Sequence, residues 1–266
     1  MYIVPMQSRH DEPSNSSPTT GHRDVNPKAA VPIMLTAFVL CLMIDNGFKF
    51  MTSPIAHDLH LSENTASLQA SLAGIVIGIG AMVYAALADS VSIRTLLIIG
   101  MVLVGVGSLI GFLFHGVWPM VLTGRLIQTS GLACAETLYV IYVTKHLPEK
   151  DQKTYLGFST SAFQLAMLLG VLTSGVVATY ISWTAMFLVA LILVLTIPVI
   201  VRTVPAEETT QAHVDVLGLF LIAVFSSSLI IVVGNFAWLP AVVALVGIAL
   251  FIWHIHAHGE LSLIHI

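Results

Sequence analysis

The sequence predicts an all-helical protein that crosses a membrane several times. Of its 266 residues, 57% are hydrophobic and only 9% are charged, whereas soluble domains carry about 25% charged residues. Eight apolar stretches follow one another, each close to the roughly 20 residues that a spanning helix needs. The strand alternation that a transmembrane β-barrel requires is absent from them. We therefore expect α-helices in a lipid bilayer.

The N-terminal segment differs from the rest of the chain. Residues 1–29 are polar, rich in Ser, Pro, Asp and His, and have no apolar core of the signal-peptide kind. We expect them to form a disordered cytoplasmic tail. The apolar stretches that follow, separated by short polar joins, are the expected helices, at 30–52, 66–88, 93–114, 117–143, 155–180, 183–202, 216–234 and 236–255.

These helices divide into two groups. Six of them form an expected bundle over residues 30–202, which a polar loop over 203–215 separates from two further transmembrane helices over 216–255. Residues 256–266 are expected to be a cytoplasmic loop. Within the bundle, small residues four apart suit the close approach of helix backbones, and we predict helix packing at Gly74, Gly78, Gly107 and Gly111.

The positions of the basic residues predict the orientation. Cytoplasmic loops carry an excess of Lys and Arg. Eight of the ten basic residues fall in the tail or in even-numbered connections, namely Arg9, Arg23, Lys28, Arg94, Lys145, Lys150, Lys153 and Arg202. This distribution predicts that both ends of the chain lie in the cytoplasm.

Two charges lie inside the fourth apolar stretch, Arg125 and Glu136. A charge at the bilayer centre costs roughly 2.5–3.5 kcal/mol, so we expect this helix to be screened from lipid or to line a wet cavity. The two residues are eleven apart, which places them on one helix face about 16 Å from each other. They are too far apart to pair, and Gln128 continues their face. A purely structural role for either residue is the alternative.

The first helix holds a second charged cluster. Asp45 and Lys49 are four residues apart, with the acid on the N-terminal side, the favourable order for an intrahelical pair. Asp45 and Arg125 lie at similar distances from the outer ends of their helices, so we predict that they come into contact. The alternative is that Asp45 and Lys49 neutralise each other and have only a structural role.

Several of these residues resemble motifs of the major facilitator superfamily. The connection after the second helix resembles the G-x-L-A-D-R-x-G-R-R signature through Leu87, Ala88, Asp89 and Arg94. The other four motif positions differ, since Ala85, Ser90, Ser92 and Ile93 replace Gly, Arg, Gly and Arg. On this tight turn, Asp89 and Arg94 are candidates for a charge latch that stabilises one state of the bundle. The fourth helix resembles R-x-x-Q-G-x-G through Arg125, Gln128 and Gly131.

Further motifs resemble the fourteen-helix drug:proton antiporter branch, which includes Gram-positive tetracycline exporters. The D-x-x-G start of a seventh helix is matched by Asp215 and Gly218. The fifth-helix motif G-P-x-x-G-G is present as "GVLTSG", with Gly170 and Gly175 kept but Val171 in place of Pro, which puts the bend of this helix in doubt. The acidic residue that tetracycline exporters carry nearby is Met167 here, so tetracycline is not the expected substrate.

The resemblance implies a transporter of which this sequence is one part. We expect an N-terminal six-helix bundle plus two linking transmembrane helices, with a C-terminal bundle missing. Residues 260–266 are expected to be either a non-native end or a natural loop that is cut short. The implied function is proton-coupled export of amphipathic small molecules across a bacterial plasma membrane, with Asp45, Lys49, Arg125, Gln128 and Glu136 in the cavity. A facilitator or metabolite exporter without proton coupling, or a non-transporting membrane protein, is the alternative.

Other classes of function find little support in the sequence. The two cysteines, Cys41 and Cys134, lie in apolar runs, so neither a disulfide nor a metal site is expected. No nucleophile–base pattern, phosphate-binding Gly loop or nucleic-acid surface is present. We expect no enzymatic activity, no cofactor and no nucleic acid, and the expected partners are a small amphipathic substrate, protons and the lipid bilayer.

Overall fold

The computed structural model describes residues 27–205 and 238–257, and five positions between them, 217, 218, 221, 224 and 228. Every regular element in these residues is helical, which confirms the all-α fold class. In chain order the elements are η1 (Pro27–Ala29), α1 (Val31–Lys49), α2 (Thr52–Asp58), α3 (Glu63–Leu87), α4 (Ile93–Leu113), α5 (Trp118–His146), α6 (Glu149–Tyr180), α7 (Ala185–Leu191), η2 (Ile192–Thr196), α8 (Ile197–Thr203) and α10 (Trp238–Ala257).

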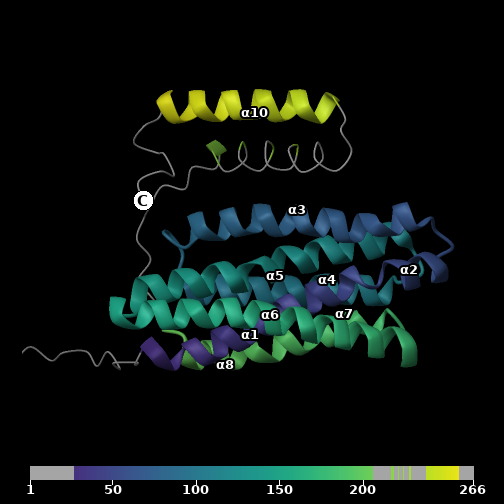
Figure 1. The fold of residues 1–266 in the computed structure, drawn as a ribbon, viewed down its shortest axis with the longest axis horizontal. Coiled ribbons are helices and arrows are strands. Elements are labelled where there is room, and N and C mark those ends of the chain that lie inside the picture. Colours follow the sequence, from purple (N-terminus) through teal and green to yellow (C-terminus); the bar gives the residue numbers. More distant parts are fainter. Residues whose placement is uncertain are drawn as a thin grey trace, which may run out of the picture.

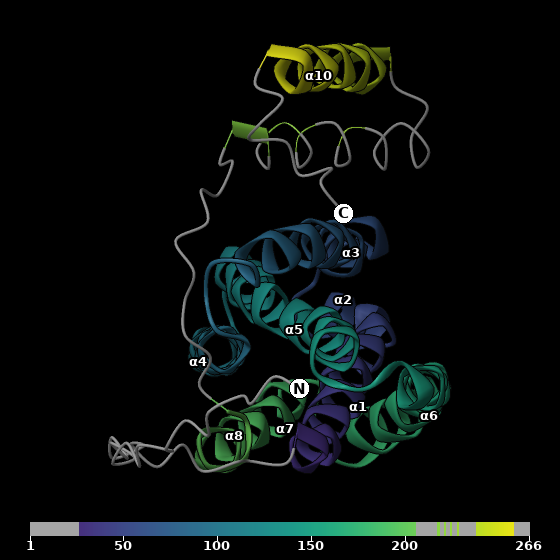
Figure 2. The ribbon, with the colours of Figure 1, turned by 90° about the vertical axis from the view of Figure 1, so that its left-hand side faces the viewer.

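Six segments of the described chain are long and apolar enough to span a membrane, and they agree with the first six predicted helices. They are Pro27–Lys49, Glu63–Leu87, Ile93–Leu113, Trp118–His146, Glu149–Tyr180 and Ala185–Thr203. The eighth predicted helix corresponds to α10, which runs beyond α3 and along the bundle axis in Figures 1 and 2. Residues 1–26 of the predicted tail, residues 206–215 of the predicted loop with Asp215, and most of the seventh helix lie outside the described residues. The last three residues of the predicted tail, Pro27–Ala29, are not disordered but form η1.

Polar caps and prolines fix where the helices begin. The hydroxyl of Ser62 accepts a hydrogen bond from the backbone N–H of Thr65 at 3.1 Å, and Ser92 does the same for Thr95 at 3.3 Å. Each cap satisfies one N–H that has no partner within the first turn. The helix α5 begins instead with Pro119 in its first turn, a position where the missing N–H costs nothing.

Two of the predicted helices, over 30–52 and 183–202, are not continuous α-helices in the structure, and each departure lies just before a proline. The first span ends as α1 at Lys49, and α2 begins at Thr52. A proline clashes with the carbonyl four residues before it and removes one backbone hydrogen bond. Pro54 acts in this way on residue 50, and Pro198 acts on residue 194, inside the 3₁₀ segment η2.

Glycines allow α4 and α5 to pack backbone to backbone. A Cβ atom at Gly124 of α5 would lie 2.5 Å from the backbone nitrogen of Gly111 on α4, and 2.7 Å from the carbonyl oxygen of Gly107. The predicted packing role of Gly107 and Gly111 is therefore confirmed. By contrast, no atom of the described residues lies within 4 Å of a Cβ at Gly74 or Gly78 on α3, so the predicted packing at these two residues is not found within the described part of the chain.

The bundle has two kinds of uncovered surface. Figure 2 shows α5 near the centre, with α4 and α8 on one side and α3, α1 and α6 around the other. Apart from Thr95 in its first turn, the exposed side chains of α4 are apolar, and large apolar side chains are exposed along the α7–η2–α8 span as well. These apolar residues are Ile99, Val102, Val106, Leu109, Leu113, Leu188, Ile192, Leu195 and Val199. Such a surface suits lipid. The other side also exposes polar side chains, among them Lys49, Ser71, Glu136, Thr160 and Gln164.

Candidate functional site

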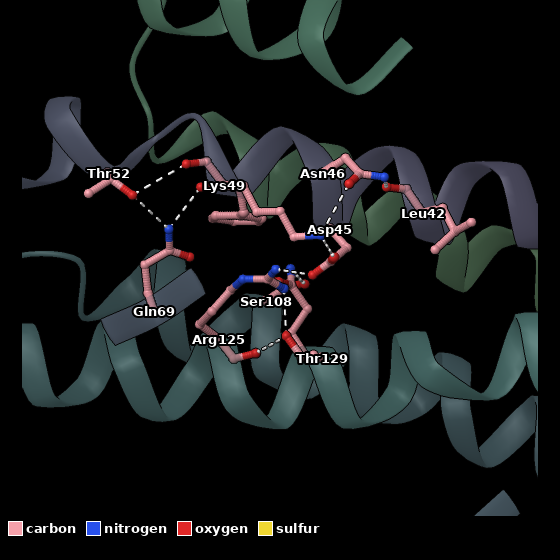
Figure 3. A network of polar contacts seen from close by, with 11 residues as sticks. Leu42, Asp45, Asn46, Lys49, Thr52, Gln69, Ser108, Arg125 and Thr129 are labelled. Atoms are coloured by element: carbon pink, nitrogen blue, oxygen red, sulfur yellow. Dashed lines mark hydrogen bonds and ion pairs between the residues drawn. The ribbon is translucent and has the colours of Figure 1, made fainter. Parts of the chain in front are cut away.

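A buried ion pair joins α1 to α5. The guanidinium of Arg125 donates from Nη2 to Oδ1 of Asp45 at 2.5 Å, and both side chains are at most 2% exposed. Its Nη1 donates to Oε1 of Gln128 at 2.9 Å and to the hydroxyl of Thr129 at 2.6 Å. The contact predicted between Asp45 and Arg125 is therefore present (Figure 3).

Asp45 is shared between two cations. Its second carboxylate oxygen, Oδ2, lies 2.9 Å from the Nζ atom of Lys49, so the predicted pair within α1 forms as well. Lys49 also donates to Oδ1 of Asn46 at 3.1 Å. Whereas the side chains of Asp45 and Arg125 are buried, the side chain of Lys49 is 45% exposed. The two predicted contacts of Asp45 thus exist together, and the three groups carry one net positive charge.

Neutral groups complete the surroundings of Arg125. The amide of Gln128 donates to the hydroxyl of Ser108 on α4 at 2.9 Å, and that hydroxyl donates to the carbonyl of Val104 at 2.6 Å. The ring of Phe48 lies 4.5 Å from the guanidinium carbon, within the range of a cation–π contact. Sequence reasoning did not single out Ser108, because a lone serine in an apolar helix carries no pattern.

Glu136 stands apart from this network. It is exposed on α5, and no hydrogen bond or ion pair to it is found among the described residues. Two neighbours, each three residues away and thus about 60° to either side around the helix axis, show which way it faces. Ala133 packs against Gly80 of α3, and Tyr139 stacks on Phe38 of α1 at 5.9 Å. Glu136 therefore faces the gap between α3 and α1, on the polar side of the bundle.

The turn between α3 and α4 carries an ion pair that the sequence did not predict. Leu87 ends α3, and Ala88 and Asp89 follow it. Lys145, near the end of α5, lies 2.8 Å from the carboxylate of Asp89 and donates to the carbonyl of Ala88 at 3.1 Å. Arg94, the other motif residue, is half-buried in the first turn of α4. The structure thus pairs Asp89 with Lys145 and not with Arg94.

The two glycines of the fifth-helix motif have different surroundings. A Cβ at Gly170 would lie 2.9 Å from the carbonyl oxygen of Met43 and 3.0 Å from Cβ of Asn46, so α6 touches α1 here, next to the ion network. At Gly175 no atom of the residues that the structure describes lies within 4 Å of such a Cβ. Gly218, from the predicted start of the seventh helix, is buried and helical.

Six apolar spans around a buried ion network define a multi-pass membrane protein. The family model described as Major Facilitator Superfamily matches residues 33–255. The chain therefore belongs to this superfamily, whose members are membrane transporters and not enzymes.

Proposed function

We propose that the protein is a proton-coupled antiporter of the fourteen-helix drug:proton branch, which exports amphipathic small molecules across the plasma membrane. Membership of a transporter superfamily supports the transport itself. The observation that carries the proposed coupling is the Asp45 carboxylate, which is shared between Arg125 and Lys49 inside the bundle.

The charges around Asp45 explain how its protonation could change the packing of α1 against α5. A buried ion pair persists only while both charges are present, because removal of one partner leaves an uncompensated charge that costs about 3–5 kcal/mol. A proton that reached Asp45 would remove the one anion that Arg125 and Lys49 share. The contact between α1 and α5 would then lose its electrostatic basis, and the helices would favour another arrangement. Proton binding and helix movement are coupled in this scheme.

Glu136 is the second acid in the proposal. It faces the polar side of the bundle without a partner among the described residues, so it is available to take up and release a proton as access changes. The apolar residues around it would contact the hydrocarbon part of an amphipathic substrate. In this proposal, protonation of Asp45 changes the contact between α1 and α5, and Glu136 exchanges protons with the cavity.

The test is transport driven by a pH gradient in proteoliposomes that contain the full-length protein. Glu136→Gln and Asp45→Asn should each abolish accumulation of a fluorescent amphipathic probe, since neither side chain could then carry a proton. Glu149→Gln, at an exposed acid in the first turn of α6, is the matched control and should transport like the wild type. Unchanged transport in both site variants would end the proposal.

One observation favours a transporter without proton coupling. In the structure α6 runs as one helix, Glu149–Tyr180, through the "GVLTSG" motif, where the antiporter motif has a helix-bending proline. If that bend is needed for tight coupling, this chain would act as a facilitator or a metabolite exporter. Probe flux that persists unchanged after addition of a proton uncoupler would select this alternative.

A further inference from the structure

The charges of the buried network do not balance. Asp45 supplies one negative charge, and Lys49 and Arg125 each supply a positive charge. Among the described residues, no other acidic side chain is in salt-bridge contact with either cation. Uncompensated charge in a low-dielectric setting attracts an opposite charge more strongly than it would in water. One further anion bound to this network would therefore neutralise its net positive charge.

Lys49 is the member of the network that an anion can reach. An ammonium group has three N–H donors, and the structure commits two of them, to Oδ2 of Asp45 and to Oδ1 of Asn46. The third has no acceptor among the described residues. The Lys49 side chain is 45% exposed, whereas Arg125 is 1% exposed and closed off by Phe48, Gln128 and Thr129.

The end of α1 holds Lys49 in place. Lys49 ends α1, where the partial negative charge of the helix C-terminus favours a cation, and it lies on the side of the bundle that exposes polar groups. At this level the side chain of Gln69 reaches across from α3 and donates to the carbonyl of Phe48 at 2.9 Å. Lys49 thus lies at the C-terminal end of α1, one residue after the carbonyl that Gln69 of α3 contacts.

We infer that Lys49 forms an anion-binding subsite of the transport cavity, and that the exported molecules are amphiphiles that carry a carboxylate or phosphate group. The inference rests on the proposed transport function, and it names the substrate class of that same cavity. The acidic group of the substrate would accept a hydrogen bond from the third N–H of Lys49, and the apolar part of the substrate would lie along α1 and α5.

The experiment is equilibrium binding to the full-length protein in nanodiscs of neutral phosphatidylcholine. The probes share one ring system and differ in charge: 1-naphthylacetate and (1-naphthylmethyl)trimethylammonium. The wild type should bind the anion at least about tenfold more tightly, the size expected for one partly exposed charge contact. Equal affinities, or a preference for the cation, would overturn the inference. Because binding is measured without a gradient, this result is independent of whether transport is coupled to protons.

Two lysines of similar exposure give a matched pair of variants. Lys49→Gln should reduce affinity for the naphthylacetate about tenfold, and Lys49→Arg should largely restore it. Lys145 also pairs with an aspartate, at 2.8 Å, and is 41% exposed, so Lys145→Gln is the control and should bind like the wild type. An equal loss in both glutamine variants would contradict the subsite, and so would no loss at Lys49. If Lys49→Gln does not assemble, the comparison of the two probes on the wild type decides.

An anionic lipid headgroup has the same chemistry as the proposed substrate group. Repeating the titration in nanodiscs that contain phosphatidylglycerol separates the two sources. Binding of the anionic probe that persists there supports a transported substrate. Binding that is lost in the wild type, with no further change in Lys49→Gln, would overturn the substrate assignment and give the subsite to a lipid.

Discussion

Asp45 of α1 and Arg125 of α5, eighty residues apart in the chain, form a salt bridge of 2.5 Å in which neither side chain is more than 2% exposed. This contact links α1 to α5, the helix that contributes three of the buried polar residues, Arg125, Gln128 and Thr129. Its burial makes it energetically different from the other ion pairs of the protein, and it is therefore the first subject for mutation.

A double-mutant cycle on Asp45 and Arg125 should reveal strong coupling. Asp45→Asn or Arg125→Met alone leaves a buried charge without its main partner and should lower the free energy of unfolding by about 3–5 kcal/mol. The double variant leaves no such charge from this pair, so its loss should be smaller than the sum of the two single losses. Thermal unfolding in detergent measures each value. Additive losses would show that the two residues do not interact energetically.

The ion pair between Asp89 and Lys145 should behave in the opposite way. Their side chains are 68% and 41% exposed, and exposed pairs contribute about 0–1 kcal/mol. Asp89→Asn should therefore change the unfolding free energy by less than about 1 kcal/mol, and the small effect should shrink further at high salt. A loss comparable to that of Asp45→Asn would contradict the exposed geometry. The charge-reversed double variant, Asp89→Lys with Lys145→Asp, is the control for any effect on transport.

Gly170 and Gly175 provide a test of helix packing within one motif. An added methyl group at Gly170 meets the backbone of α1 at 2.9 Å and cannot be relieved by a side-chain rotation. Gly170→Ala should therefore destabilise the protein by about 1–3 kcal/mol. Gly175→Ala adds the same group to open space, and because alanine is the better helix former it should be neutral or slightly stabilising. Thermal unfolding of the two variants side by side is the measurement.

The sequence was sufficient to predict the spans, because a bilayer demands long apolar helices. It was less informative about their ends. The fifth span was expected to begin at 155, yet α6 begins at Glu149 after Pro148. Its first turn is polar, with Glu149 and Asp151 at the positive end of the helix dipole. Hydropathy does not distinguish such a turn from a loop, since the turn lies where water is available.

The site was predictable where geometry follows from one helix or from depth. The four-residue spacing of Asp45 and Lys49 and the matched depths of Asp45 and Arg125 both led to contacts that the structure contains. Lys145 could not be assigned to Asp89, because that pairing depends on how the end of α5 packs against a turn 56 residues away. Ser108 depends in the same way on the α4–α5 interface. Contacts set by tertiary packing leave no local pattern.

The direction in which Glu136 faces can be tested by cysteine labelling, since maleimides react with thiolates, which form in water and not in hydrocarbon. Glu136→Cys in the full-length protein should react about tenfold faster or more with a water-soluble maleimide than Val106→Cys does. Val106 is 45% exposed but lies on the apolar surface of α4, so exposure alone does not predict the difference. The wild type is the blank that subtracts any reaction at native cysteines, and the two in this sequence, Cys41 and Cys134, are buried. Equally slow labelling at 136 and 106 would place Glu136 against lipid and remove it from the proposed cavity, whereas fast labelling at 136 alone requires water between α3 and α1.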